Sequence, residues 1–311
     1  MIKVDALTHR YGDAVALAGI SFEIPRGQVV GLVGPNGAGK TTTMKILTGY
    51  LAADSGSAAI GGHDIVRERL AAQSLMGYLP ENAPVWRDLL VQDYLMLMAK
   101  LRQVAASERR ARFSEVVSAL DLESVLVKPV AHLSKGFRQR VGLAQAMIHN
   151  PEVLILDEPT SGLDPAQIME IREVIRRMGN EKTVILSTHI LSEVEATCDR
   201  ALMIVGGRIH VDENIASIRH GRGLRVRVVG APTGTKAKLA TIPGVLAVEE
   251  STEQDGSQLF RLQTSPERDV ALAVAEAARA AGLLVTELTR ERHDLEEIFR
   301  ALKHGDAGRA A

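Results

Sequence analysis

The sequence predicts an α/β domain built around one glycine-rich loop, followed by a smaller α+β domain. An apolar run of strand length, residues 29–33, leads directly into the loop at residues 34–41, and a helical stretch follows at residues 42–48. A second apolar run, residues 153–156, ends in two adjacent carboxylates. After residue 223 strand and helix patterns begin again. These observations together indicate two domains.

Composition excludes several classes of protein. With 46% hydrophobic and 24% charged residues, the 311-residue chain is globular and long enough for two cores. A net charge of −1 gives no reason to expect a nucleic-acid partner. The single cysteine, Cys198, fits a reducing, cytoplasmic setting. The segment most similar to a membrane span, residues 270–288, is interrupted by charges, so we expect neither a membrane span nor a signal peptide.

The chain begins with two expected strands, residues 2–8 and 15–24, which should pair antiparallel. Tyr11 lies between them. It is either a platform on which an adenine ring stacks or a half-buried surface tyrosine. A turn at residues 25–27 then leads into the strand before the glycine-rich loop.

The loop fits the pattern of a glycine, four residues, then glycine, lysine and threonine, which cradles phosphates. Its backbone amides and the positive end of the next helix attract an anion. Lys40 should neutralise phosphate oxygens, and the Thr41 hydroxyl should ligate Mg²⁺. An ordinary glycine-rich turn is the alternative. We predict that ATP is held by the loop and the residue after it: Gly34, Pro35, Asn36, Gly37, Ala38, Gly39, Lys40, Thr41 and Thr42.

Residues 82–150 should form a helical subdomain, because apolar residues recur at helical spacing over residues 91–127 and again after Ser134. As a helix N-cap, Ser134 would leave amides free to receive a γ-phosphate, although a plain capped helix is the simpler interpretation. Glu81 precedes this region. It either helps to order Mg²⁺ or the attacking water, or is a solvated loop glutamate, which its chemistry alone favours.

The next strand ends in Asp157 and Glu158, whose side chains should point to opposite faces and do different work. Asp157 is expected to hold Mg²⁺ through water, and Glu158 to polarise the water that attacks the γ-phosphate. Asp164 then caps a helix that ends near Gly179. A strand at residues 183–188 follows, and His189 at its carboxyl end is placed for a γ-phosphate contact.

In this order, these motifs resemble those of the nucleotide-binding subunit of an ATP-binding-cassette (ABC) transporter, over residues 1–219. The resemblance implies that two copies of the chain sandwich two ATP molecules, with Ser134 and Gly136 serving the ATP of the partner copy. It also implies Tyr11 as the adenine platform and His189 as the γ-phosphate switch, and the same motifs add Lys135 and Asp164 to the nucleotide-binding residues.

Two departures from the usual family pattern are informative. The signature reads Leu-Ser-Lys-Gly-Phe from residue 133, where Leu-Ser-Gly-Gly-Gln is usual, and Glu81 stands where most members have glutamine. Both are similar to the type-2 exporter branch, which includes subunits associated with gliding motility and with copper-site maturation. The extra negative charge of Glu81 near phosphates should weaken ATP binding unless the metal offsets it.

After a linker at residues 220–223, residues 224–302 show a βαββαβ order that predicts a small ferredoxin-like domain, in which Arg225 and Arg227 face solvent. Asp294 with Glu297 should cap a last helix, and residues 303–311 should fray. The segment resembles the accessory domain of type-2 exporter subunits. It carries no group of catalytic side chains, so dimerisation or regulation is its expected role.

The resulting hypothesis is an ATP-hydrolysing dimer at the cytoplasmic face of the membrane that drives a separate permease, with Lys40, Glu158 and His189 as catalytic residues. Two alternatives are weighed. A soluble cassette ATPase acting on ribosomes or nucleic acid is disfavoured by the single phosphate loop and the lack of a heptad tract. A module that uses ATP only as a clamp is disfavoured by the intact pair of acids.

Overall fold

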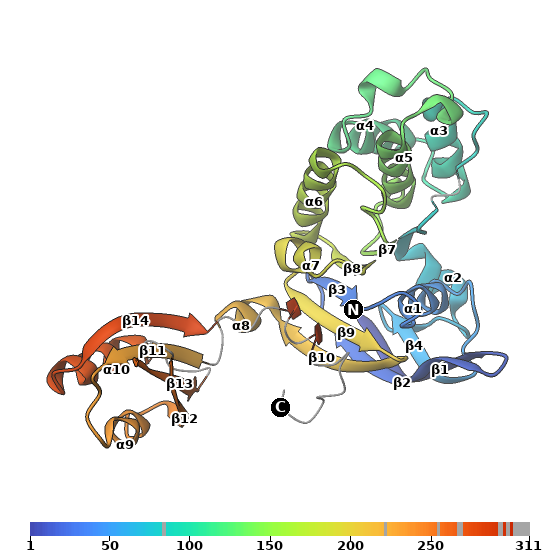
Figure 1. The fold of residues 1–311 in the computed structure, drawn as a ribbon. Coiled ribbons are helices and arrows are strands. Elements are labelled where there is room, and N and C mark those ends of the chain that lie inside the picture. Colours follow the sequence, from blue (N-terminus) through green and yellow to red (C-terminus); the bar gives the residue numbers. More distant parts are fainter. Residues whose placement is uncertain are drawn as a thin grey trace. The chain divides into compact units, whose positions relative to one another are not determined.

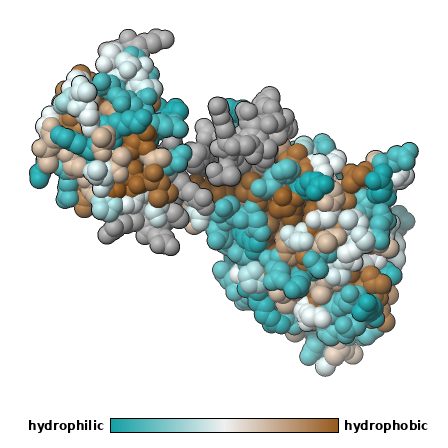
Figure 2. All heavy atoms as spheres, turned by 90° about the horizontal axis from the view of Figure 1, so that it is seen from below, coloured by the Kyte–Doolittle hydropathy of each residue, from teal (hydrophilic) through white to brown (hydrophobic). Residues whose placement is uncertain are grey.

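A computed structural model of the chain describes residues 1–82, 85–220, 223–253, 256–265, 270–291, 295–296 and 299–300. The chain divides into two compact units, Met1–Asp212 and Glu213–Ala311. Figure 1 shows the elements of both. Hydrophilic residues cover much of the face drawn in Figure 2, with smaller hydrophobic patches between them. Within the described ranges, no helix combines the length and the apolar character needed to cross a membrane.

The first unit begins with the predicted antiparallel pair. Strands β1 (Ile2–Tyr11) and β2 (Ala14–Ile24) pair from Ile2 opposite Ile24 to Tyr11 opposite Ala14. Two further strands, β4 (Ser55–Ile60) and β5 (His63–Asp64), complete a sheet of order β2-β1-β4-β5. The prediction of an antiparallel start is confirmed, and both strands are longer than expected.

The second sheet of this unit carries the candidate site. Its order is β10-β9-β3-β8-β7-β6, and its strands are β3 (Val29–Val33), β6 (Met76–Leu79), β7 (Val153–Asp157), β8 (Thr183–Thr188), β9 (Arg200–Val205) and β10 (Arg208–Asn214). Strands β3, β8 and β7 are adjacent, parallel and buried along their whole length. Burial on both faces explains why they read as continuous apolar runs.

The register of these strands brings three sequence motifs together. Val33 lies opposite Thr188, and Asp157 lies opposite Ser187. The phosphate loop, the two acids and His189 therefore leave the sheet at one edge, the carboxyl end of its parallel strands, where α/β proteins bind their ligands.

Some helices of the first unit pack on its sheets, and others pack together in a separate group. They are α1 (Lys40–Leu47), α2 (Arg69–Ser74), α3 (Val91–Leu101), α4 (Arg109–Ala119), α5 (Lys135–Met147), α6 (Pro165–Gly179) and α7 (Leu191–Thr197). The two helices predicted within residues 91–127 are confirmed as α3 and α4. In Figure 1, α3, α4 and α5 lie together, away from β1, β2 and β4. Helix α5 packs on β6, α3 and α4, whereas α1 packs on β7, β8 and β2.

The second unit has the predicted βαββαβ order. After α8 (Ile215–His220), its elements are β11 (Gly223–Val229), α9 (Thr235–Ala240), β12 (Val245–Thr252), β13 (Gln258–Thr264), α10 (Ala271–Ala280) and β14 (Leu284–Glu291). The sheet order is β12-β13-β11-β14, and all of its pairings are antiparallel. Its core includes Phe260, which is fully buried, and Val274 from α10.

Two predictions for the second unit have different outcomes. The arginines of β11 are half-buried rather than fully solvated, and Nε of Arg227 lies 3.4 Å from Oε2 of Glu287 on the neighbouring strand. The capping box of Asp294 with Glu297 and the tail at residues 303–311 lie outside the described residues.

Candidate functional site

Two glycines of the phosphate loop are required by close backbone contacts. A Cβ on Gly34 would lie 2.1 Å from the carbonyl oxygen of Ile204. A Cβ on Gly39 would lie 2.6 Å from the carbonyl oxygen of Ala16, and Gly39 has a φ of 110°, which side chains disfavour. The loop can therefore follow this path between β3 and α1 only with glycine at both positions.

Lys40 begins α1 and is almost completely buried, with 6% of its surface exposed. Its Nζ donates hydrogen bonds to the carbonyl oxygens of Gly34, at 2.8 Å, and Pro35, at 3.3 Å. The same ammonium lies 3.6 Å from Oε1 of Glu158. A cation is thus held directly beneath the loop, between the expected phosphate position and the second acid.

Asp157 lies at the end of β7 and is 1% exposed. Its Oδ1 accepts a hydrogen bond from the hydroxyl of Thr41, at 3.2 Å, and another from the hydroxyl of Ser187. A hydroxyl and a carboxylate are the oxygen ligands that Mg²⁺ prefers. Among the described residues, no group of three or more His, Cys, Asp or Glu is arranged to hold a metal. Phosphate oxygens and water would complete a Mg²⁺ site at Thr41 and Asp157.

Glu158 is held in a strained conformation. Its φ of 48° is in the left-handed region, which a non-glycine residue adopts at an energetic cost. Its amide donates to both oxygens of Ser187, the carbonyl at 3.2 Å and the hydroxyl at 3.0 Å. Its Oε2 lies 2.9 Å from Nδ1 of His189. The Glu158 side chain is 10% exposed, whereas the His189 side chain is 48% exposed. The structure thus pairs the two groups predicted to act on the γ-phosphate.

Tyr11 and Glu81 are exposed. Tyr11 ends β1, is 51% exposed, and meets the ring of His9 edge-on, with 4.7 Å between the ring centroids. The phenol ring therefore has one neighbouring ring in the chain, and half of the residue's surface remains exposed to a stacking partner. Glu81 lies in a turn directly after β6. Strand β6 pairs with β7, the strand that carries Asp157.

Two predicted nucleotide-binding residues cap helices. The Ser134 hydroxyl accepts from the amide of Phe137 at 3.3 Å, at the start of α5. The Asp164 carboxylate accepts from the amide of Gln167 at 3.0 Å, at the start of α6. Because α5 belongs to the separate helical group, the signature and the phosphate loop of one chain occupy different parts of the unit.

The unusual lysine of the signature contacts the loop before α6. A Cβ added to Gly162 would lie 1.9 Å from Nζ of Lys135, and one added to Gly136 would lie 2.7 Å from the amide carbon of Gln167. Gly162 also has a φ of 68°. Both glycines therefore allow the signature and the loop after the acid pair to approach closely.

Burial sets the protonation of two groups near the site. Burial, and then the charge of Asp157, raise the pKa of the Tyr78 hydroxyl on β6, which stays neutral. Burial, followed by the charges of Asp199 and Glu193, raises the pKa of the Cys198 thiol. A thiol with a raised pKa is a poor nucleophile, so Cys198 is a structural residue.

Sequence reasoning did not identify Ser187 and Glu193 as part of the site. Ser187 bonds both Asp157 and Glu158, and Glu193 accepts hydrogen bonds from Thr160 and Thr188. Ser187 offered a signal, as a polar residue within an apolar strand, whereas the burial of Glu193 on α7 is known only from the structure.

Comparison with known proteins indicates the family to which the chain belongs. The family model described as ABC transporter matches residues 17–161. The daunorubicin resistance ATP-binding protein DrrA3 of Streptomyces coeruleorubidus is 34% identical, over 98% of this chain and 96% of its own. The lantibiotic transport ATP-binding protein SrtF of Streptococcus pyogenes is 37% identical, over 68% of this chain and 90% of its own.

A solved structure of the ATP-binding subunit of an ABC transporter is 30% identical and has a TM-score of 0.65, covering 70% of this chain and 92% of its own. Its coverage fits the length of the first unit, and DrrA3 extends the similarity through the second. The chain therefore belongs to the family of ABC transporter ATP-binding proteins.

Proposed function

We propose that the chain is the ATP-hydrolysing subunit of an exporter, in which two copies close on two ATP molecules and drive a separately encoded permease. Residues 1–219 act as the ATPase domain and residues 224–302 as an accessory domain. The subunit works at the cytoplasmic face of the membrane. The single observation that carries the proposal is the pairing of Glu158 with Lys40 and His189 at the edge of the sheet where the phosphate loop ends.

The chemistry assigned to this edge is hydrolysis of the γ-phosphate. Phosphoryl transfer needs positioning and charge more than covalent help from the protein. Lys40 neutralises the phosphate oxygens, and Glu158 orients the attacking water and accepts its proton. His189 contacts the γ-phosphate while it holds Glu158. Thr41 directly, and Asp157 through water, would hold Mg²⁺, which supplies positive charge to the phosphates when it is bound.

The position of the signature supports the proposed dimer. In each copy, the first amides of α5, capped by Ser134, are offered to a phosphate together with Gly136 and the ammonium of Lys135. Helix α5 packs with α3 and α4 rather than with α1, and the resemblance to ABC transporter subunits assigns these groups to the ATP of the second copy. The edge of the sheet and the signature then form two composite sites between two chains.

Export is supported by the names of the relatives, one in daunorubicin resistance and one in lantibiotic transport. The cargo touches the permease, so this chain leaves the identity of the cargo open.

Tyr50, Val66 and Leu70 are each more than 70% exposed and lie after α1 and around α2. The Gln73 side chain of α2 bonds the carbonyl of Thr48 at 3.0 Å and joins these segments. Exposed apolar side chains of this kind suit a protein partner.

Glu158→Gln tests the hydrolysis assignment. The variant should bind ATP with the affinity of the natural chain but lose at least about 100-fold in turnover, because the amide cannot accept a proton from water. Glu181→Gln, at an exposed glutamate after α6, is the matched control and should hydrolyse normally. Comparable hydrolysis by Glu158→Gln would remove the residue from its assigned role.

Isolation of the chain from detergent-solubilised native membranes tests the transport assignment. Recovery with a stoichiometric multi-span protein that lacks its own phosphate loop supports a transporter and identifies its permease. Recovery only from the soluble fraction, together with ribosomes or nucleic acid, would reassign the ATPase to the alternative function.

A further inference from the structure

A buried carboxylate outside the predicted site connects its two catalytic loops. Glu193 lies on α7 and is 4% exposed. The Thr160 hydroxyl lies 2.8 Å from each of its carboxylate oxygens, and the Thr188 hydroxyl donates to Oε2, also at 2.8 Å. Thr160 and Thr188 are themselves 5% and 0% exposed. Burying a carboxylate is costly unless hydrogen bonds and charge compensate it, and here several do.

The two threonines are the chain neighbours of the catalytic pair. Thr160 follows Glu158 by two residues, and Thr188 directly precedes His189. The Thr188 hydroxyl also accepts from the amide of Ile190, at 3.1 Å, so it contacts the backbone on the far side of His189. One carboxylate thus bonds the loops that carry both catalytic side chains.

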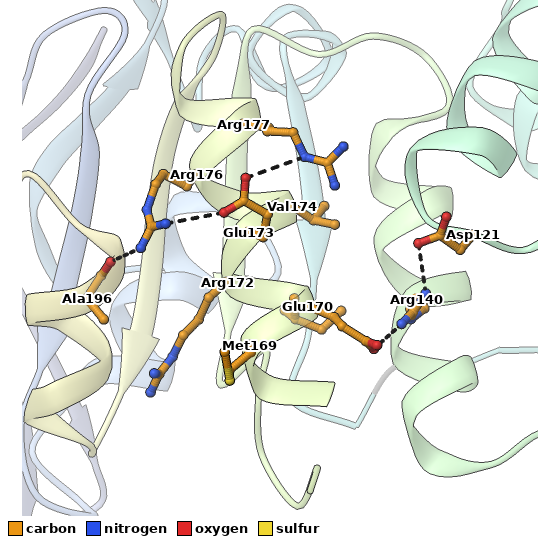
Figure 3. Close-up of a pocket in the computed structure, with 11 residues that line it drawn as sticks. Asp121, Arg140, Met169, Glu170, Arg172, Glu173, Val174, Arg176, Arg177 and Ala196 are labelled. Carbon is orange, nitrogen blue, oxygen red and sulfur yellow. Dashed lines mark hydrogen bonds and ion pairs between the residues drawn. The ribbon is translucent and has the colours of Figure 1, made fainter. Parts of the chain in front are cut away.

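Arg172 of α6 balances the charge of Glu193, with Nη2 3.7 Å from Oε1. Its side chain is 23% exposed and lines a hollow of about 530 Å³ along α6. Figure 3 shows Arg172 on the same helix as Met169, while Arg176 bonds the carbonyl of Ala196 at the end of α7. Contacts from α6 therefore also hold α7, and with it Glu193.

The strained backbone of Glu158 needs such support. A non-glycine residue at a φ of 48° persists only where the surrounding structure holds it. Ser187 holds the amide of Glu158, and the loop beyond closes through the amide of Ser161 on the Glu158 carbonyl, at 3.1 Å. The bond from Thr160 to Glu193 fixes this loop against α7. Without it, the loop can relax and move the carboxylate away from His189.

We propose that Glu193 is a positioning residue for ATP hydrolysis, which keeps Glu158 and His189 in hydrogen-bonding distance by holding Thr160 and Thr188. The inference rests on the proposed hydrolysis at Glu158. Since Glu193 acts through its neighbours, its loss lowers the rate of the chemical step and leaves nucleotide affinity unchanged.

Steady-state hydrolysis by Glu193→Gln tests the proposal, because glutamine keeps the size of the side chain but offers one acceptor oxygen in place of two. We expect kcat to fall at least about tenfold, with KM for MgATP within about twofold. Trapping of ADP with orthovanadate, which reports the transition-state geometry, should fall in parallel. The exposed Glu181→Gln serves again as the control for loss of a glutamate charge.

Substitutions at Thr160 separate positioning from folding. Thr160→Ser keeps the hydroxyl and should keep kcat, whereas Thr160→Val should reduce it as Glu193→Gln does. The double variant Thr160→Val with Glu193→Gln should lose little more kcat than either single variant, because both substitutions remove the same hydrogen bond. These threonine variants decide the question even if Glu193→Gln does not fold.

A lower melting temperature with unchanged kcat, or equal rates for the serine and valine variants, would overturn the positioning role. Failure of the proposed function would give a different experimental result. In that case the natural chain and Glu158→Gln hydrolyse ATP equally, whatever the behaviour of Glu193.

Discussion

The stability of the first unit should fall in mild acid because of one half-buried histidine. His149 follows α5, and its Nε2 lies 3.0 Å from the carbonyl oxygen of Met76 on β6. Burial, and then the charge of Arg102, lower the pKa of His149 to about 4, from an ordinary value of 6.5. The folded chain therefore keeps this imidazole neutral in a range where the unfolded chain protonates it.

The sign and size of the effect follow from the two pKa values. Between pH 6.5 and pH 4 the unfolded state binds one more proton, so the free energy of unfolding decreases as the pH is lowered. Above pH 6.5 both states are neutral and the contribution disappears. The slope approaches about 1.4 kcal/mol per pH unit, which gives a loss of about 2 kcal/mol at pH 5 and about 3 kcal/mol near pH 4.

Urea unfolding at pH 7.5 and pH 5 measures this loss. The single tryptophan, Trp86, lies in the first unit, so its fluorescence follows the unit that contains His149. His149→Gln keeps a side-chain donor but cannot become charged, and should lose about 2 kcal/mol less than the natural chain between the two pH values. His132→Gln, at an exposed histidine, should behave like the natural chain. Parallel pH dependence of the natural chain and His149→Gln would refute the reasoning.

Three further predictions concern nucleotide contacts. Tyr11→Ala should weaken ATP binding by up to about tenfold through lost stacking, whereas Tyr11→Phe keeps the ring and the affinity; equal losses in a binding titration would exclude stacking. Glu81→Gln should strengthen MgATP binding by removing a charge near the phosphates, and unchanged affinity and turnover would make the residue a bystander. Gly162→Ala should reduce turnover less in a Lys135→Gly background, because the lysine amine occupies the position of the new methyl group; additive losses would show that the contact does not matter.

The parts of the site that follow from local sequence could be predicted. The phosphate loop, the acid pair and His189 each come directly after an apolar run, and parallel strands buried on both faces deliver their carboxyl ends to one edge. The order of elements in the second unit could also be predicted, because apolar and polar residues alternate along its strands and turns separate its helices. Strand β4 was not predicted, since its sequence SGSAAI has little β-branched or aromatic content.

The parts that depend on contacts between distant residues could not be predicted. The bond between Thr160 and Glu193 joins residues 33 positions apart, and Glu193 on α7 reads in isolation as an ordinary helix acid. The left-handed backbone of Glu158 could not be predicted from the sequence either, because nothing in an Asp-Glu-Pro sequence requires a positive φ. Both features arise only after the sheet has placed β7 and β8 side by side.

The site therefore has two levels of organisation, and they imply two kinds of functional loss. Strand register determines which groups reach the edge of the sheet, and the phosphate-loop residues outside the predicted catalytic set, such as Asn36 and Thr42, are predicted to act mainly on binding. Hydrogen bonds from Ser187 and Glu193 then determine how the acids are turned, which affects the transition state more than the ground state. A substitution in the first set should raise KM, and one in the second should lower kcat at constant KM. A chain whose two sets of variants showed the same kinetic pattern would have a site organised by the loop alone.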